Sequence, residues 1–247
     1  MTTNSHFEAR VAARRKEVAA QEGQRRNGRK IVAIIAGVLA LLLIAGAVLY
    51  MAPVFTVREY KVTGNNIATV EEIQEAAQVP EGANLLHVDT NAAARSVAKV
   101  PWVQSVTVDR ALPSTLSIEV TEREVVAFVK SRDGDRLIDS HGNEFVIAAP
   151  PKGAVEIAGL DGDAAKGEKQ RASAVAILAA VSEKVRAKVD RLEVEGDYKY
   201  VFHLKDGRSV VWGANDNNEA KAAAMDTVLK MRGKDWNITN PEMVTKK

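Results

Sequence analysis

The chain has 247 residues, of which 34 are Lys or Arg and 32 are Asp or Glu, so its formal net charge at pH 7 is only +2. A near-neutral total argues against a nucleic-acid-binding protein, which needs a large cationic surface. Because the chain contains no cysteine, disulfides, thiol nucleophiles, cysteine-ligated zinc and iron–sulfur clusters are excluded.

The charge is distributed unevenly along the chain. Residues 1–30 contain eight basic and three acidic residues, whereas residues 53–247 carry a net charge of −3. Between them, residues 31–52 form an uncharged run of 22 residues. As a helix this run would be about 33 Å long, close to the thickness of a bilayer's hydrocarbon core. It has no polar face and is longer than the apolar region of a cleaved signal peptide. We therefore expect one transmembrane helix over 31–52, preceded by a basic tail over 1–30.

Basic residues flank only the N-terminal end of the expected transmembrane helix. Residues 25–30 contain four of them, while residues 53–60 contain only Arg58, which is followed by Glu59. Segments rich in Lys and Arg stay in the cytoplasm. The N-terminus is therefore expected to be cytoplasmic, and residues 53–247 are expected to lie outside the cytoplasmic membrane.

The first part of the outside region predicts the element order β-α-α-β-β. Thr69 and Glu72 have the spacing of a capping box at a helix N-terminus, and Pro101 indicates the end of a second helix. Alternating apolar residues then predict a hairpin of two half-buried strands. Trp102, which follows Pro101, is expected to be buried between helix and sheet. The five elements are expected over residues 57–62, 69–79, 90–99, 105–109 and 116–121.

From Val125 onward the pattern favours strands, interrupted by two helices. Strands are expected over 125–130, 136–138, 144–147, 192–194, 200–204 and 209–212, and helical spacing over 174–185 and 217–230. Residues 235–240 remain to form a last strand. A strand that comes last, after a helix, is expected at a sheet edge with one row of backbone groups unpaired.

The sequence predicts no enzyme, no cofactor and no metal site. Asp139-Ser140-His141-Gly142 contains the residue types of a serine-hydrolase triad, but a triad is assembled from distant segments, so we interpret it as a hairpin turn. The four histidines show no ligand spacing, and no phosphate-binding loop, dinucleotide fingerprint or zinc-protease motif occurs.

Several short motifs occur in order along the outside region. They are Val62-Thr63-Gly64, Asn84-Leu85-Leu86 before Asp89, Pro101-Trp102-Val103, Arg110-x-x-Pro113, Ile118-x-Val120-x-Glu122-Arg123 and Leu137-Ile138-Asp139-x-x-Gly142-x-x-Phe145. Because of the first five of these motifs, residues 57–124 resemble the POTRA domain of the FtsQ/DivIB family of bacterial cell-division proteins. The last resembles the opening of that family's β domain.

The resemblance implies an α+β fold with a fixed domain order. A single transmembrane helix (31–52) follows the cytoplasmic tail (1–30) and precedes a β-α-α-β-β POTRA domain. A mixed β domain with two helices and a short C-terminal tail complete the chain. The last three segments are placed at 53–124, 125–241 and 242–247.

The resemblance also implies a function without catalysis. The protein would be a divisome scaffold in the cytoplasmic membrane, concentrated at the septum, that binds other division proteins to assemble or regulate septal cell-wall synthesis. The implied partners are an FtsB/DivIC-type and an FtsL-type protein, with a septal penicillin-binding protein and an FtsW-type protein left open as further partners. No nucleic acid or small-molecule substrate is implied. In this family the FtsB/DivIC-type partner binds along the final strand, and the matching residues are Trp236, Asn237, Ile238, Thr239 and Asn240.

Two other interpretations remain open. The first is a membrane-anchored POTRA chaperone or secretion accessory that holds extended polypeptides by strand addition. The second concerns the final strand alone. Trp236 and Ile238 could complete the domain core, and Pro241 could end the strand as a guard against aggregation.

Overall fold

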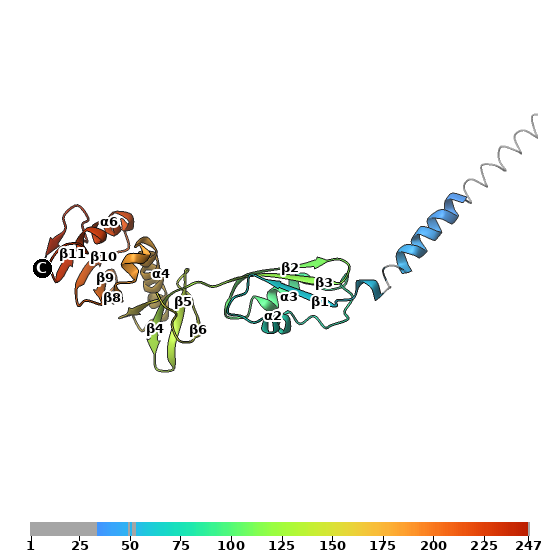
Figure 1. Ribbon diagram of the computed structural model, residues 1–247, viewed down its shortest axis with the longest axis horizontal. Coiled ribbons are helices and arrows are strands. Elements are labelled where there is room, and N and C mark those ends of the chain that lie inside the picture. The colour runs from blue at the N-terminus through green and yellow to red at the C-terminus, as the bar shows by residue number, and fades with distance from the viewer. Residues whose placement is uncertain (1–33, 49, 51–52, 247) are drawn as a thin grey trace, which may run out of the picture. The chain divides into compact units, whose positions relative to one another are not determined.

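The computed structural model describes residues 34–48, 50 and 53–246 (Figure 1). Residues 34–48 and 50 are helical, and their described side chains are exposed. The basic tail expected over 1–30 and the remaining positions of the helix expected over 31–52 lie outside the described residues. Within the described part of the chain, no helix meets the length and hydropathy that a membrane crossing requires.

The chain divides into two compact units, of which the first combines the chain up to Glu59 with Pro80–Val88 and Arg110–Leu116. Backbone hydrogen bonds hold these three segments together. The Val57 N–H donates to the Ala83 carbonyl at 2.8 Å, and the Arg58 N–H donates to the Ser114 carbonyl at 2.9 Å. A short 3-10 helix, η1 (Pro53–Phe55), precedes these contacts. The second unit comprises Tyr60–Val79, Asp89–Asp109 and Ser117–Lys247.

The smaller sheet confirms the expected order β-α-α-β-β. Its elements are β1 (Glu59–Thr63), α2 (Val70–Ala77), α3 (Thr90–Val97), β2 (Val103–Ala111) and β3 (Thr115–Glu122), and the strand order is β1-β3-β2. The Thr69 hydroxyl accepts a hydrogen bond from the Glu72 N–H at 3.1 Å, so it caps α2 as predicted. The Glu122 carboxylate accepts from the N–H groups of Asn66, Ile67 and Ala68 at 2.8–3.0 Å. This carboxylate therefore fixes the turn between β1 and α2 to the end of β3.

The expectation that Trp102 is buried between helix and sheet is wrong. Val103 occupies the core position at the start of β2 and is 1% exposed, whereas Trp102 is only half-buried. Successive residues of an extended chain point to opposite sides, so burying Val103 turns the indole away from this core. The Trp102 ring instead meets the Phe145 ring edge-on, with 5.1 Å between the ring centroids.

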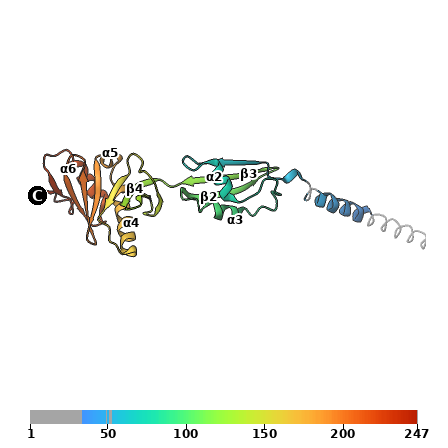
Figure 2. The same cartoon turned by 90° about the horizontal axis from the view of Figure 1, so that it is seen from below.

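The larger sheet has nine strands and is mixed (Figure 2). Its strands are β4 (Val125–Ser131), β5 (Gly134–Asp139), β6 (Glu144–Ile147), β7 (Val155–Ala158), β8 (Val189–Glu195), β9 (Lys199–Leu204), β10 (Ser209–Gly213), β11 (Asp235–Asn237) and β12 (Thr245–Lys246). They lie in the order β12-β11-β10-β9-β8-β7-β4-β5-β6. The pairs β4–β7, β7–β8 and β10–β11 are parallel, and the others are antiparallel. The predicted antiparallel meander is β8-β9-β10.

The parallel pairs require crossover connections, and helices supply two of them. The long helix α4 (Ala164–Ala180) and the short α5 (Glu183–Arg186) connect β7 to β8, while α6 (Asn218–Val228) connects β10 to β11. The helices α4 and α6 contact each other and share one hydrophobic core with the strands. They therefore cover the same face of the sheet.

Two expectations for this region need correction. The β domain has three helices among its described residues instead of two, because α4 ends at Ala180 and Val181 is extended, with ψ of 144°. The Ser182 hydroxyl then accepts from the Val185 N–H and begins α5. Val185 is buried in the same core as the apolar residues of α4. Its position therefore continued their helical spacing in the sequence, and the two helices were predicted as one. The expected C-terminal tail over 242–247 contains the strand β12.

Candidate functional site

The segment singled out in the sequence, 236–240, begins in β11 and ends in the loop before β12. Strand β11 is parallel to β10, with Val210 opposite Trp236 and Val211 opposite Asn237. The pairing continues one residue further, because the Ile238 N–H donates to the Val211 carbonyl at 2.9 Å. The first half of the segment is therefore an integral part of the larger sheet.

The expectation that residues 235–240 form the unpaired edge strand is wrong. The strand ends at Asn237, and β12 pairs antiparallel with it, with Lys246 opposite Trp236 and Thr245 opposite Asn237. A turn makes this return possible, because the Met243 N–H donates to the Asn240 carbonyl at 3.1 Å. A two-residue strand has no periodicity that a sequence pattern can reveal. The outermost strand at this end of the sheet is β12.

The side chains of the segment divide into buried and accessible groups. Trp236 and Ile238 are 4% and 0% exposed and belong to the core shared by the sheet and its helices. The interpretation that these two residues complete the core is therefore confirmed. Asn237 is half-buried, and Thr239 and Asn240 are exposed. The backbone of β11 is paired with β10 on its inner side and with β12 on its outer side.

Thr239 is held by two neighbours. Its N–H donates to Oδ1 of Asn237 at 2.9 Å. Its side chain lies against Gly213, where an added Cβ would come within 2.8 Å of Thr239 Cγ2, and Gly213 has a φ of +79°. Both the conformation and the close approach require glycine at the end of β10.

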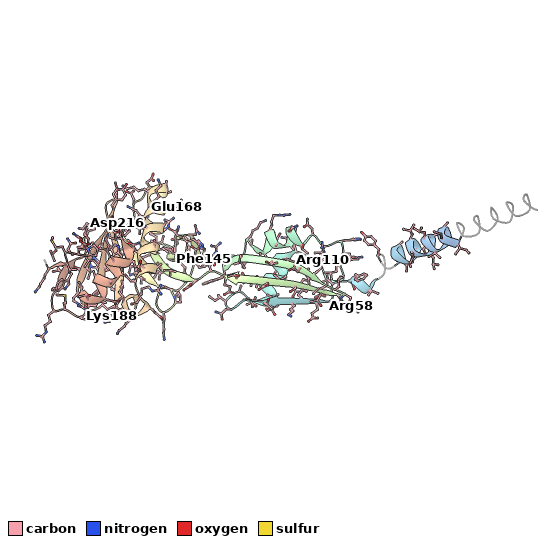
Figure 3. All side chains as sticks on the ribbon, turned by 90° about the horizontal axis from the view of Figure 1, so that it is seen from above. Arg58, Arg110, Phe145, Glu168, Lys188 and Asp216 are labelled. Atoms are coloured by element: carbon pink, nitrogen blue, oxygen red, sulfur yellow. The ribbon has the colours of Figure 1, made fainter. Side chains whose placement is uncertain are left out.

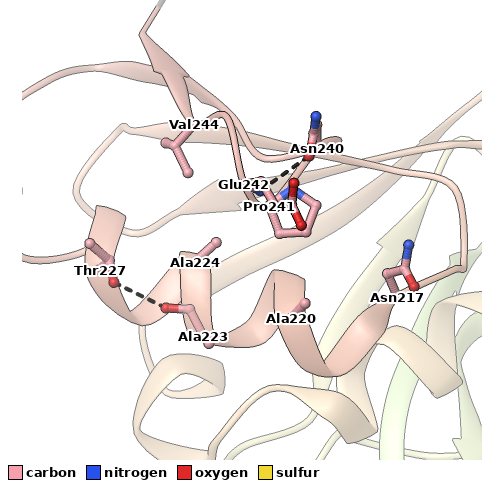
Figure 4. A pocket seen from close by; sticks show the side chains of 9 residues that line it. All are labelled: Asn217, Ala220, Ala223, Ala224, Thr227, Asn240, Pro241, Glu242 and Val244. Atoms are coloured by element: carbon pink, nitrogen blue, oxygen red, sulfur yellow. Dashed lines mark hydrogen bonds between the residues drawn. The ribbon is translucent and has the colours of Figure 1, made fainter.

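A groove of about 750 Å³ lies beside this segment (Figure 4). One wall is α6 together with Asn217, which directly precedes it. The other wall is the loop that leads from residues 236–240 to β12. The lining residues are Asn217, Ala220, Ala223, Ala224, Thr227, Asn240, Pro241, Glu242 and Val244. Alanines keep the helical wall low, and Glu242 is the only ionisable side chain among these nine. The groove is therefore suited to apolar or neutral side chains.

A buried lysine supports the loop at the start of α6. Lys221 is 0% exposed, and its Nζ donates to the Ala214 carbonyl at 2.9 Å and to the carboxylate of Asp216 (labelled in Figure 3). Asn217, which lines the groove, follows in this loop with a φ of +46°. Our reading of the sequence missed Lys221. Its burial could have been predicted from the helical spacing, which places Lys221 on the same face of α6 as Met225 and Val228.

The turn at Asp139-Ser140-His141-Gly142 confirms our structural interpretation of that motif. Asp139 Oδ1 accepts from the N–H groups of His141 and Asn143, both at 2.9 Å. Burial acts to raise the pKa of Asp139, but the bonds from Asn143, His141 and Arg123 hold that pKa below its ordinary value. Ser140 and His141 are both exposed. Across the described part of the chain, no group of three or more His, Asp or Glu residues is placed to hold a metal ion.

Comparison with known families matches most of the chain. Residues 55–123 match the family described as "POTRA domain, FtsQ-type", and residues 127–241 match "Cell division protein FtsQ/DivIB, C-terminal". The second match therefore ends before β12 begins.

Proteins that are similar to this chain in sequence are also described as cell division proteins. The chain is 38% identical over 218 residues to the cell division protein FtsQ of Corynebacterium glutamicum, covering 88% of this chain and 98% of that one. It is 32% identical over 244 residues to the cell division protein FtsQ of Mycobacteroides abscessus, covering 97% and 78% respectively. The major extracytoplasmic domain of DivIB from Geobacillus stearothermophilus aligns with 15% identity and a TM-score of 0.35, over 45% of this chain and 99% of that one.

Proposed function

Because the chain belongs to the FtsQ/DivIB family of bacterial cell-division proteins, we propose that it is a non-enzymatic scaffold of the division machinery. It binds other membrane division proteins outside the cytoplasmic membrane and so helps to assemble or regulate septal cell-wall synthesis. The family match supports the division role, and the absence of catalytic motifs from the sequence supports the scaffold role.

The proposed topology follows from the sequence. Residues 31–52 are uncharged and cross the cytoplasmic membrane once, the basic residues 1–30 stay in the cytoplasm, and the remainder is extracytoplasmic. A POTRA domain over 53–124 and a β domain over 125–241 then lie outside, with the protein concentrated at the division septum. Protease added to spheroplasts should digest the outside part and spare an N-terminal tag.

The proposed binding site is the β11 end of the larger sheet, and the proposed partner is an FtsB/DivIC-type protein paired with an FtsL-type protein. The observation that carries this proposal is the backbone of β11, next to the groove beside α6. Among the described residues, two positions of β12 pair with the outer side of β11. An extended segment added to a sheet gains affinity from main-chain hydrogen bonds and selectivity from pockets for its side chains. The β11 backbone offers the hydrogen bonds, and the groove offers the pocket.

The five matched residues contribute in different ways to this proposed site. Trp236 and Ile238 keep β11 in place through their buried side chains, and their neighbour Asn237 offers backbone groups. The exposed side chains of Thr239 and Asn240 are available for direct contact, and Asn240 lines the groove.

Capture of the FtsB/DivIC-type protein by the full-length chain tests the proposal. We expect Ala223→Arg to abolish capture, because Ala223 is exposed and its new side chain would fill the groove. The matched control is Ala164→Arg, at the exposed start of α4, which should leave capture unchanged. A fluorescent fusion should gather at midcell. Capture by Ala223→Arg at the control's level, or a fusion spread evenly over the envelope, would contradict the proposal.

A further inference from the structure

The strand β12 is weakly attached to the rest of the fold. It consists of Thr245 and Lys246, both exposed, and it pairs with β11 over two residue positions. Val244, the residue directly before β12, is partly buried and packs against the core. The turn that leads to β12 is held by local bonds, in which Asn240 accepts from the N–H groups of Glu242 and Met243 at 3.1 Å. Little buried surface therefore opposes the release of β12.

The strand that β12 covers is, by contrast, firmly anchored. Trp236 and Ile238 are buried in the core, and the Ile238 N–H is bonded to β10 on the inner side of β11. Releasing β12 would uncover the outer backbone groups of β11 while leaving the strand itself in position. An uncovered row of such groups is a template for another strand.

We propose that β12 is a displaceable cover, and that the partner's extended segment takes its place on β11. This inference rests on the proposed function, because it assumes that a division protein binds at this end of the sheet. The alternative geometry, pairing with the outer side of β12, would use a template of two exposed residues in the described part of the chain. Strands in globular proteins usually contain at least three residues, so β12 alone is a poor template.

Displacement also makes two further groups available. Val244 lines the groove and packs on the core, so releasing the residues that follow it leaves the groove beside β11 free for a side chain of the incoming segment. The Thr239 N–H, now bonded to the Asn237 side chain, becomes the next donor along β11 if that side chain turns away. The incoming segment can thus form a longer ladder than β12 does.

A cover of this kind lowers the affinity of the intact protein for its partner. The apparent dissociation constant rises as the fraction of uncovered molecules falls. Ending the chain after Val244 should therefore tighten binding of the FtsB/DivIC-type protein's extracytoplasmic domain about three- to tenfold, while Val244 still packs on the core. The control Thr245→Ala keeps the backbone of β12 and should leave the affinity unchanged.

A reversible lock gives the second arm of the test. Asn237 and Thr245 lie opposite each other, and the chain has no cysteine, so Asn237→Cys with Thr245→Cys can form only one intramolecular disulfide. We expect the oxidised protein to bind the same domain at least about tenfold more weakly than the reduced protein. Comparing two redox states of one protein removes the effect of the substitutions themselves. The single variant Thr245→Cys should not respond to the reductant.

The possible results separate the inference from the proposed function. Weaker binding by the oxidised form, together with tighter binding by the truncated chain, supports displacement. Equal binding by the oxidised and reduced forms, or loss of binding on truncation, would show that the partner pairs outside β12 and would overturn the inference alone. If the intact, truncated and reduced proteins all fail to bind, the proposed function fails and the inference with it.

Discussion

Arg123 and Asp139 form an ion pair in which Arg123 Nη1 lies 2.5 Å from Asp139 Oδ2, and the Asp139 side chain is only 1% exposed. Arg123 directly follows β3, and Asp139 ends β5. The Arg123 side chain also donates to the Pro101 carbonyl at 3.1 Å. These contacts connect the segment after β3 with the turn that follows β5.

The hydrogen bonds that Asp139 accepts from Asn143, His141 and Arg123 predict a pH dependence of stability. The pKa of Asp139 is lowered in the folded state, so folding favours its ionised form. The resulting stabilisation is complete above the ordinary pKa of 3.8 and is lost as the pH falls through the folded-state value. We expect the free energy of unfolding to fall as the pH is lowered below the ordinary pKa of 3.8, and to fall less steeply in Asp139→Asn. Denaturant unfolding at several pH values measures both slopes, and identical slopes would contradict the assignment.

The burial of Trp236 predicts a large loss of stability on truncation. Trp236→Ala should lower the free energy of unfolding by about 3–5 kcal/mol, as for other buried aromatic side chains. Trp236→Phe should cost much less, because the indole N–H has no hydrogen-bond partner among the described residues and the ring packing is largely kept. Thermal melting distinguishes the two variants. A Trp236→Ala protein that melts like the parent would place the indole outside the core.

The contact between Gly213 and Thr239 predicts a coupled pair of substitutions. Gly213→Ala should destabilise the protein by at least about 1 kcal/mol, because its φ is +79° and the new Cβ meets the Thr239 side chain. Adding Thr239→Ala should recover part of the loss, since it removes the two closest atoms. The remaining cost reflects the strained backbone. Urea unfolding of the four proteins in the double-mutant cycle gives the coupling, and strict additivity would exclude the contact.

The two residues of the Lys221–Asp216 ion pair are expected to contribute unequally to the free energy of unfolding. Lys221→Met should lower the free energy of unfolding by about 1–3 kcal/mol, because the Ala214 carbonyl loses its donor. Asp216→Asn should change it less, since the Asp216 side chain is 65% exposed and the amide oxygen of the new Asn can still accept a hydrogen bond from Lys221 Nζ. Chemical denaturation of both variants makes the comparison. Equal losses would indicate that the ion pair itself, and not the carbonyl bond, stabilises the loop.

The half-buried position of Trp102 predicts a moderate effect in place of the large one expected for a core residue. Trp102→Ala should cost less than the loss of about 3–5 kcal/mol for a fully buried aromatic side chain, and the coupling of its ring to Phe145 should be about 0.5–1.5 kcal/mol. Phe145→Ala should cost at least as much, because it removes the same ring contact and also the contact with Arg123, whose guanidinium carbon lies 5.8 Å from the Phe145 ring centroid. A double-mutant cycle on Trp102 and Phe145 measures their coupling. An additive cycle would show that the two rings do not interact in solution.

Local patterns in the sequence determined much of the fold. The capping pair Thr69 and Glu72, the alternation in β2 and β3, and the turns of the β8-β9-β10 meander each depend on residues close together in the chain. Period, turn chemistry and capping act over a few residues, so they can be recognised without the tertiary structure. Residues 236–240 were singled out through family resemblance, but the expectation that they form the edge strand was wrong, because β12 pairs with the outer side of β11.

Only the tertiary structure decided how the β11 end of the larger sheet is completed. The return of the chain to form β12, the parallel pairing of β11 with β10 and the burial of Lys221 depend on contacts between segments that no local period encodes. The same holds for Trp102 and Val103, because the tertiary structure buries the Val103 side chain in the core and leaves the Trp102 side chain only half-buried. A sequence pattern shows which residues can be buried, whereas packing against distant segments selects which of them are.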